Sequence, residues 1–135
     1  MKPEAIVTES LQQYLLRTGQ ATPRFLQGAF PFIGAGITER VALADEAEYT
    51  VPEYHKAEVL YLRAGNHTES LIYLTLCANN RPVRYFPLGK SEAMHIPLAI
   101  VETHPAGTKL TLQVSAARGE SGLVIVDLGL LEFSL

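Results

Sequence analysis

Four histidines and three neighbouring glutamates are the side chains in this chain best suited to chemistry, because imidazole and carboxylate groups bind metals and transfer protons. The pairs are Glu53 with His55, His67 with Glu69, and Glu102 with His104, while His95 stands alone. Residues two positions apart share one face of a strand, so each pair could supply ligands to a mononuclear metal site. The histidines are separated by 12, 28 and 9 residues, which matches no established ligand spacing. Surface positions near turns are the simpler interpretation.

An acidic run offers a second possible ion site. Asp45, Glu46 and Glu48 begin a run that continues to Glu53 and Glu58. Calcium is held by several carboxylate and backbone oxygens, so a structural calcium ion near the first three of these residues is one hypothesis. A solvated edge strand, whose charges oppose sheet-to-sheet aggregation, explains the same run without an ion. We expect no other cofactor.

Asp127 lies within a strongly apolar segment, where a carboxylate is costly unless it is paired. We expect a structural pairing with Arg63 or Arg84 rather than catalysis. The motifs of nucleotide-binding loops, zinc metalloproteases and serine hydrolases are absent. The sequence therefore favours a protein that is not an enzyme, with no catalytic residues to name.

Composition limits the partners. The chain has 135 residues, which suits a single domain, and a net charge of -3, so it lacks the basic excess typical of nucleic-acid binders. No apolar run approaches the length of a membrane span, and the polar start is unlike a secretory signal. We therefore expect no membrane or nucleic-acid partner, and a cytoplasmic or virion location. The single cysteine, Cys77, excludes an internal disulfide and is expected to be buried.

The elements that must position these side chains begin with a predicted helix over residues 3–18. Apolar side chains recur there at helical spacing, at Val7, Leu11, Tyr14 and Leu15. Residues 20–36 are rich in proline and glycine, yet they carry Phe25, Phe30 and Phe32. A free linker would be polar, so this segment is either an edge strand or an extended apolar arm. We treat 1–36 as helix and arm.

From residue 37 the hydrophobic pattern changes to a period of two, which is typical of strands. Residues 110–114 alternate cleanly, and residues 123–133 are apolar on both faces. About eight short strands with turn signals between them predict an all-β antiparallel sandwich over 37–135. No second helical pattern alternates with the strands, so we do not expect a parallel α/β sheet.

Arginines and aromatic residues surround the hairpin that turns at residues 78–82. The set comprises Arg63, Arg81, Arg84 and Tyr85. Arginine and tyrosine are enriched at interface hot spots, so these residues are candidates for a contact patch, together with the apolar side chains of the helix and arm. Ordinary edge-strand side chains remain the alternative.

Residues 57–133 resemble the galactose-binding-like jelly roll of family-6 and family-35 carbohydrate-binding modules. The resemblance rests on residues 57–64, the hairpin at 79–82, residues 94–101, the AGTKLTLQVS stretch at 106–115, and VIVDL at 124–128. It implies a jelly-roll sandwich and, in the sugar-binding members, stacking of sugar rings on exposed Trp or Tyr. This chain has no Trp, so a sugar would have to stack on tyrosines. The candidates are Tyr49, Tyr54, Tyr61, Tyr73 and Tyr85.

Three functions are carried forward. The first is a non-catalytic assembly protein, a homo-oligomer or part of a larger assembly, whose sandwich and N-terminal arm pack on neighbouring subunits. A phage virion component, such as a capsid-decoration or tail-adaptor protein, would fit this role. The alternative is a carbohydrate-binding module that uses Tyr, with a glycan as partner. The second alternative is a cupin-like metal-dependent enzyme, which needs at least three of the His and Glu side chains to converge.

Overall fold

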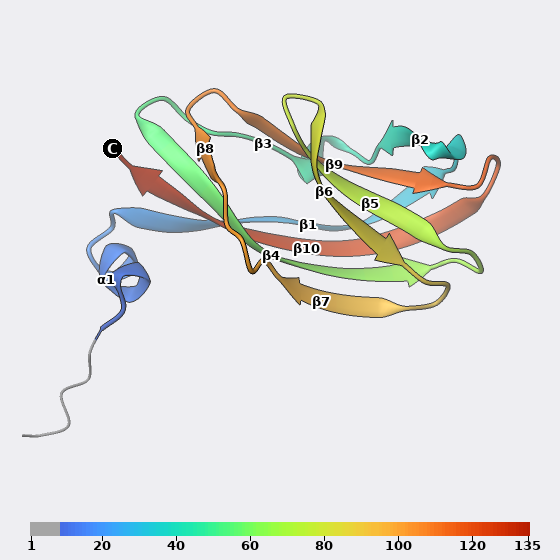
Figure 1. Cartoon of the computed structure of the whole chain (residues 1–135), viewed down its shortest axis with the longest axis horizontal. Coiled ribbons are helices and arrows are strands. Elements are labelled where there is room, and N and C mark those ends of the chain that lie inside the picture. Colours follow the sequence, from blue (N-terminus) through green and yellow to red (C-terminus); the bar gives the residue numbers. More distant parts are fainter. Residues whose placement is uncertain (1–8) are drawn as a thin grey trace, which may run out of the picture.

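Two antiparallel sheets pack face to face in the computed structural model, which describes residues 9–135 (Figure 1). Sheet A contains β1 (Ala21–Ile33), β10 (Ser121–Ser134), β4 (His55–His67) and β7 (Ala93–Pro97) in that order, with β8 (Thr103–Pro105) also paired to β4. Sheet B contains β2 (Gly36–Ala42), β9 (Lys109–Ala116), β5 (Ile72–Ala78) and β6 (Arg81–Leu88), with β3 (Glu48–Thr50) also paired to β9. The predicted all-β antiparallel sandwich is confirmed. β3 and β8 are three residues long, too short to show alternation in the sequence.

Alternation along the strands divides core from surface. On β9, Leu110, Leu112 and Val114 are buried between the sheets. On β10, the buried residues that face the same core are Val124, Val126, Leu128 and Leu130. Because successive side chains point to opposite faces, the residues between them form the outer faces of the two sheets. Each sheet therefore presents one broad outer surface.

The segment at residues 20–36 has the structure of an edge strand, and not of an extended arm. All thirteen residues of β1 pair with β10 in one unbroken antiparallel register. Leu26, Phe30 and Phe32 enter the core between the sheets, which explains the apolar character of the segment. The prediction that Phe30 and Phe32 contact a neighbouring subunit is therefore wrong, because both side chains are buried within the chain.

The prolines of β1 lie on its free edge. Ser134 donates its backbone N–H to Gln20, and Gly34 donates to Glu120, so the even-numbered residues of this register point their backbone groups at β10. Pro23 and Pro31 are odd-numbered and face outward, where a missing N–H costs no ladder bond.

The helix is shorter than the prediction of 3–18. α1 (Leu11–Arg17) begins after Ser10, whose hydroxyl accepts from the Gln13 N–H while the Gln13 side chain accepts from the Ser10 N–H. Glu9 and Ser10 are not helical, and the remainder of the predicted range, including Val7, lies outside the described residues. The exchange of bonds between Ser10 and Gln13 sets the start of the helix.

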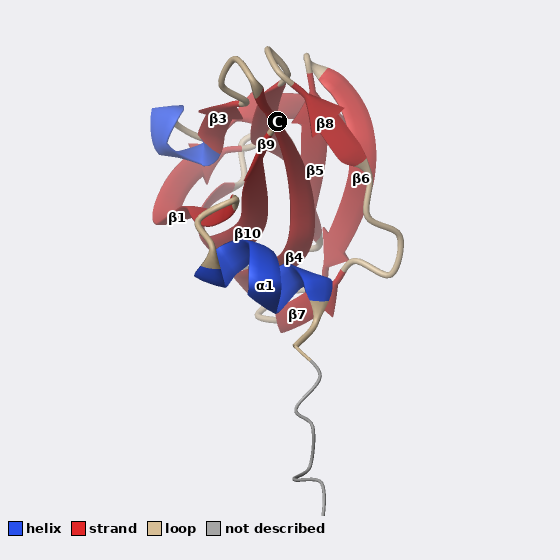
Figure 2. Cartoon of the chain, turned by 90° about the vertical axis from the view of Figure 1, so that its left-hand side faces the viewer, coloured by secondary structure: helices blue, strands red, loops and turns tan. Residues whose placement is uncertain are grey.

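Figure 2 shows α1 beside the ends of β10 and β4. Its Leu15 packs against Ala21, Leu131 and Phe133, while Leu11 and Tyr14 remain exposed. No helix within the part of the chain that the structure describes has the length and apolar character needed to span a membrane.

A short 3-10 turn, η1 (Asp45–Ala47), connects β2 to β3. It exposes Asp45 and Glu46, whereas Ala47 is buried in the core. Glu48, at the start of β3, forms an ion pair with Lys109 at 3.2 Å. This carboxylate therefore has a protein partner, and calcium binding near these residues stays a prediction.

Candidate functional site

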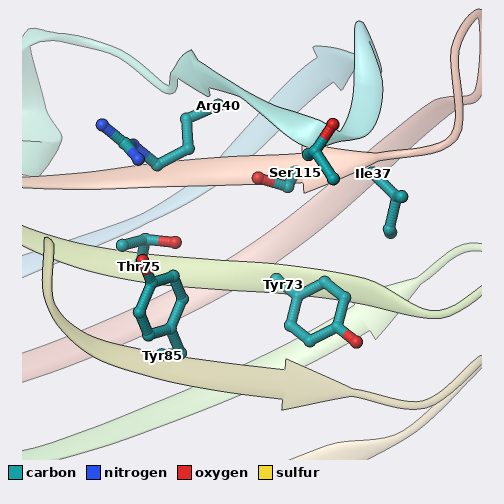
Figure 3. A pocket seen from close by; sticks show the side chains of 7 residues that line it. Ile37, Arg40, Tyr73, Thr75, Tyr85 and Ser115 are labelled. Atoms are coloured by element: carbon teal, nitrogen blue, oxygen red, sulfur yellow. The ribbon is translucent and has the colours of Figure 1, made fainter.

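A groove on the outer face of sheet B is the clearest candidate site (Figure 3). It has a volume of about 370 Å³, at the lower end of the range for ligand pockets. Four strands build it. The lining residues are Ile37, Thr38 and Arg40 from β2, Ser115 from β9, Tyr73 and Thr75 from β5, and Tyr85 from β6.

The pairing of β5 explains why these side chains meet. Leu74 and Leu76 point into the core, so Tyr73 and Thr75 must point outward. The register sets Tyr73 opposite Ser115, and Thr75 opposite Tyr85. The two tyrosines thus lie on neighbouring strands, with Thr75 two residues from Tyr73 along β5 and directly opposite Tyr85. In Figure 3 both rings border the floor of the groove.

Thr75 is the most unusual residue of the groove. It is only 1% exposed, and its hydroxyl has no hydrogen-bond partner among the described residues. A buried hydroxyl without a partner costs roughly 1–3 kcal/mol. Thr111 is also buried, but its side chain lies opposite the Cys77 thiol and does not line the groove. Thr75 therefore lines the groove with a hydroxyl that lacks a partner among the described residues, and the side chains around it cover its oxygen almost completely.

Arg40 is held in place at the border of the groove. Its Nε donates to Gln113 Oε1 at 2.9 Å, and Gln113 Nε2 in turn donates to Asn80 Oδ1 at 3.0 Å. Arg40 forms no ion pair with any of residues 9–135. Within the described part of the chain, the lining contains this one cation and no carboxylate. The groove thus combines aromatic rings, hydroxyl groups and a positive charge.

The sequence identified only part of this groove. Tyr73 was a predicted sugar-stacking residue, and Tyr85 was a candidate for contact and for stacking. Thr75, Arg40 and Ser115 were missed. The signal for Thr75 was present, since it follows Tyr73 by two positions in a strand and so shares its face.

The other predicted tyrosines lie elsewhere. Tyr49 donates a hydrogen bond to Glu132 inside one end of the sandwich. Burial, more than this hydrogen bond, raises the pKa of Tyr49. Tyr54 is 78% exposed in a turn with a positive φ of 63°. Tyr61 lies on the outer face of sheet A, where it donates to Asp127. Only Tyr73 and Tyr85 share a site.

The arginines are also divided between surfaces. Arg63 is on the outer face of sheet A, whereas Arg81 is exposed at the β5–β6 turn. Arg84 forms an ion pair with Glu102 at 2.6 Å. Asp127 has neither expected arginine as an ion-pair partner and accepts hydrogen bonds from Tyr61 and Gln27 instead.

A buried carboxylate that the sequence reading overlooked lies on β10. Glu132 is 7% exposed and accepts bonds from Tyr49 and Arg24. Burial acts to raise its pKa, but the hydrogen bonds from Tyr49 and Arg24 outweigh burial and lower it. Because Tyr49 is on β3 and Glu132 on β10, this contact joins the two sheets.

The histidines do not converge in the described part of the chain, where no three His, Cys, Asp or Glu side chains are placed to hold a metal ion. His55 Nδ1 is 2.7 Å from the Glu53 carbonyl oxygen. His104 is buried, and this burial lowers its pKa. His95 lies edge-on to Tyr61, with ring centroids 5.7 Å apart. The convergence that a cupin-like metal site requires is thus missing from residues 9–135.

Comparison with known proteins gives distant likenesses of fold. No family model and no curated protein sequence matches the chain. A chain from Bacillus endospore appendages, described as disulfide-linked pili, is similar with a TM-score of 0.47 and 9% identity, over 87% of this chain and 92% of that chain. A family 35 carbohydrate-binding module from Clostridium thermocellum has a TM-score of 0.46 and 16% identity, over 81% of this chain and 97% of that chain.

An exo-beta-1,3-galactanase from Phanerochaete chrysosporium is similar with a TM-score of 0.38 and 10% identity, over 80% of this chain and 29% of that chain. The family 35 module is of the kind that residues 57–133 were predicted to resemble. All three likenesses describe the path of the chain alone.

Proposed function

We propose that this chain is a non-catalytic binding module whose groove on sheet B holds a short saccharide. The observation that carries the proposal is the Thr75 hydroxyl, buried and unpartnered at the groove floor beside Tyr73 and Tyr85. Once the side chains that cover it move aside, a polyhydroxylated ligand can both donate to and accept from this hydroxyl, which would remove the cost of its burial.

The aromatic rings support the same ligand class. A sugar ring has an apolar C–H face and a rim of hydroxyl groups. Tyrosine offers a flat apolar body with a polar tip, and Tyr85 is 62% exposed. Ser115 and the Arg40 guanidinium lie within the same groove and can bind ring hydroxyls. The groove therefore fits both parts of a sugar.

The lining also favours binding without catalysis. Glycoside hydrolysis uses a pair of carboxylates on either side of the scissile bond. Among residues 9–135, no Asp or Glu lines the groove. A saccharide in this groove would therefore be held and released unchanged.

A glycan array followed by titration calorimetry tests the proposal. The full chain should bind at least one saccharide, and Tyr85→Ala should weaken binding about tenfold or more, because loss of a stacking ring removes about 1.4 kcal/mol or more. Tyr54→Ala is the matched control, since Tyr54 is exposed outside the groove. Absence of any bound saccharide, or equal losses in both variants, would contradict the proposal.

An assembly role is the second candidate, because a different surface favours it. Large apolar side chains are exposed on α1 and on sheet A: Leu11, Tyr14, Leu16, Phe25, Ile33 and Ile125. Where such side chains gather in one patch, the patch is characteristic of surfaces that contact another protein. A virion subunit, as first suggested by the sequence, is one such role. Sedimentation of the full chain over a concentration series tests for self-association, and a chain that stays monomeric would count against homo-oligomeric assembly.

A further inference from the structure

The outer face of sheet A carries a polar row that crosses all four of its main strands. The register aligns Gln27 on β1, Asp127 on β10, Arg63 on β4 and His95 on β7. Asp127 accepts hydrogen bonds from neutral donors, Gln27 Nε2 at 3.1 Å and Tyr61 Oη at 3.2 Å. The Arg63 guanidinium lies 5.5 Å from the centroid of the Tyr61 ring.

Arg63 and Asp127 are adjacent, yet neither is neutralised. No ion pair joins either of them to any charged group among residues 9–135. Arg63 is exposed and Asp127 is half-buried. The face therefore presents one positive and one negative group side by side, each able to accept a partner of opposite charge.

The next row provides a projection and a hollow. Ile125 on β10 is 53% exposed, which is unusual for a large apolar side chain in the middle of a sheet. Opposite it on β4 is Gly65, where an added Cβ would meet no atom within 4 Å. Gly65 and Ala93 border an open hollow of about 590 Å³. A projecting isoleucine on β10 thus lies beside a hollow on β4 that could hold an isoleucine side chain.

We propose that this face binds a second copy of the chain in a twofold dimer. The twofold axis lies between the two facing copies, above the outer face of sheet A, and runs parallel to the strands over the line between β4 and β10. Rotation about this axis sets each β10 position opposite the β4 position of the same register in the other copy. Arg63 then faces Asp127 of the second copy, and Ile125 faces the hollow at Gly65 of the second copy. Each contact occurs twice, as a self-complementary interface requires.

The partner is inferred to be a second copy because the same twofold rotation matches both the charged side chains and the projecting isoleucine with its hollow. Two further apolar side chains, Phe25 and Ile33, are exposed on the same face of β1. With strands about 4.8 Å apart and a rise of about 3.3 Å per residue, the uncovered area is roughly 19 by 27 Å. Two copies would bury on the order of 1,000 Å², near the lower limit for specific interfaces. We expect a dissociation constant in the micromolar range.

This inference rests on the assembly role proposed above, to which it assigns a surface and a partner. Sedimentation velocity of the full chain should show a monomer–dimer equilibrium. Arg63→Asp and Asp127→Arg should each raise the dissociation constant about tenfold or more, because like charges then face one another across the axis. An equimolar mixture of these two variants should dimerise again, since each copy then meets its opposite. Tyr85→Ala, on the other sheet, is the control and should leave the constant unchanged.

Ile125→Asp is the second variant, chosen because it changes an exposed position and so keeps the fold if Asp127→Arg does not. It should also raise the dissociation constant about tenfold or more. A wild-type chain that is monomeric at every concentration overturns the dimer. A chain that associates, but whose association is insensitive to Ile125→Asp and to the charge variants, overturns this surface and leaves the assembly role standing.

Discussion

Replacing Thr75 by valine should stabilise the protein and weaken the groove at the same time. Valine has nearly the same shape as threonine but lacks the hydroxyl, and it is favourable in a strand. The Thr75 hydroxyl is buried without a partner, so its removal relieves a desolvation cost without breaking a hydrogen bond. A ligand that uses this hydroxyl would lose a contact.

The expected gain is about 1–2 kcal/mol in the free energy of unfolding, the lower part of the range for an unsatisfied buried hydroxyl. For a domain of this size the gain corresponds to a rise in Tm of roughly 3–8 °C. Differential scanning calorimetry and urea denaturation measure both quantities, and titration calorimetry with the bound saccharide measures the loss of affinity.

Thr111→Val is the control for the groove, because Thr111 is also a buried threonine of sheet B but does not line the groove. It should leave saccharide affinity unchanged. A Thr75→Val protein that is destabilised by 1 kcal/mol or more would refute the reasoning, since that result requires a satisfied hydroxyl.

Three further predictions concern the fold. Tyr49→Phe should lower the free energy of unfolding, measured in urea, by about 1.5–3 kcal/mol, because the Glu132 carboxylate loses a hydrogen-bond donor. The pKa of Glu132 is lowered in the folded state, so the stability that its charge confers is present above the unfolded pKa and is lost as pH falls through the folded pKa. Glu132→Gln should therefore remove this loss of stability at acid pH from a pH series of melts. Pro31→Val should restore a donor to the free edge of β1 and increase aggregation measured by light scattering, and equal scattering would contradict the protective role of the proline. Ser10→Ala should unravel α1, because loss of the N-cap costs the helix about 1 kcal/mol. The main melting transition should stay unchanged, because α1 contacts the sandwich mainly through Leu15. Amide hydrogen exchange at Gln13 measures the local effect.

The sandwich itself could be predicted from local patterns. Leu110, Leu112 and Val114 alternate with polar residues, and this alternation alone states which face of β9 is buried. Residues 21–33 were harder, since Phe25 and Phe32 fit no single period. Residues 21–33 pair along their whole length with β10, which lies about a hundred residues further along the chain. A local sequence pattern cannot predict so distant a partner.

The groove, too, is predicted in part by local sequence patterns and decided in part by pairing between distant strands. Tyr73 and Thr75 share a face because of the two-residue period of a strand, which the sequence contains in full. Their meeting with Tyr85, Ser115 and Arg40 depends on the register of β5 with β6 and β9 and on the place of β2 beside β9. Register is set by the turns and by the joint packing of all core residues, and so it belongs to the tertiary structure.

By itself, the sequence determined an all-β sandwich with one N-terminal helix, since the partition of side chains between core and water repeats at the period of each element. Tertiary structure alone decided which surface side chains become neighbours. It left the Thr75 hydroxyl without a partner among residues 9–135, in a groove that two tyrosines also line, and it set Arg63 beside Asp127. Both arrangements arise from strand pairing between segments distant in the chain, because hydrogen-bonded registers fix cross-strand neighbours to within a residue.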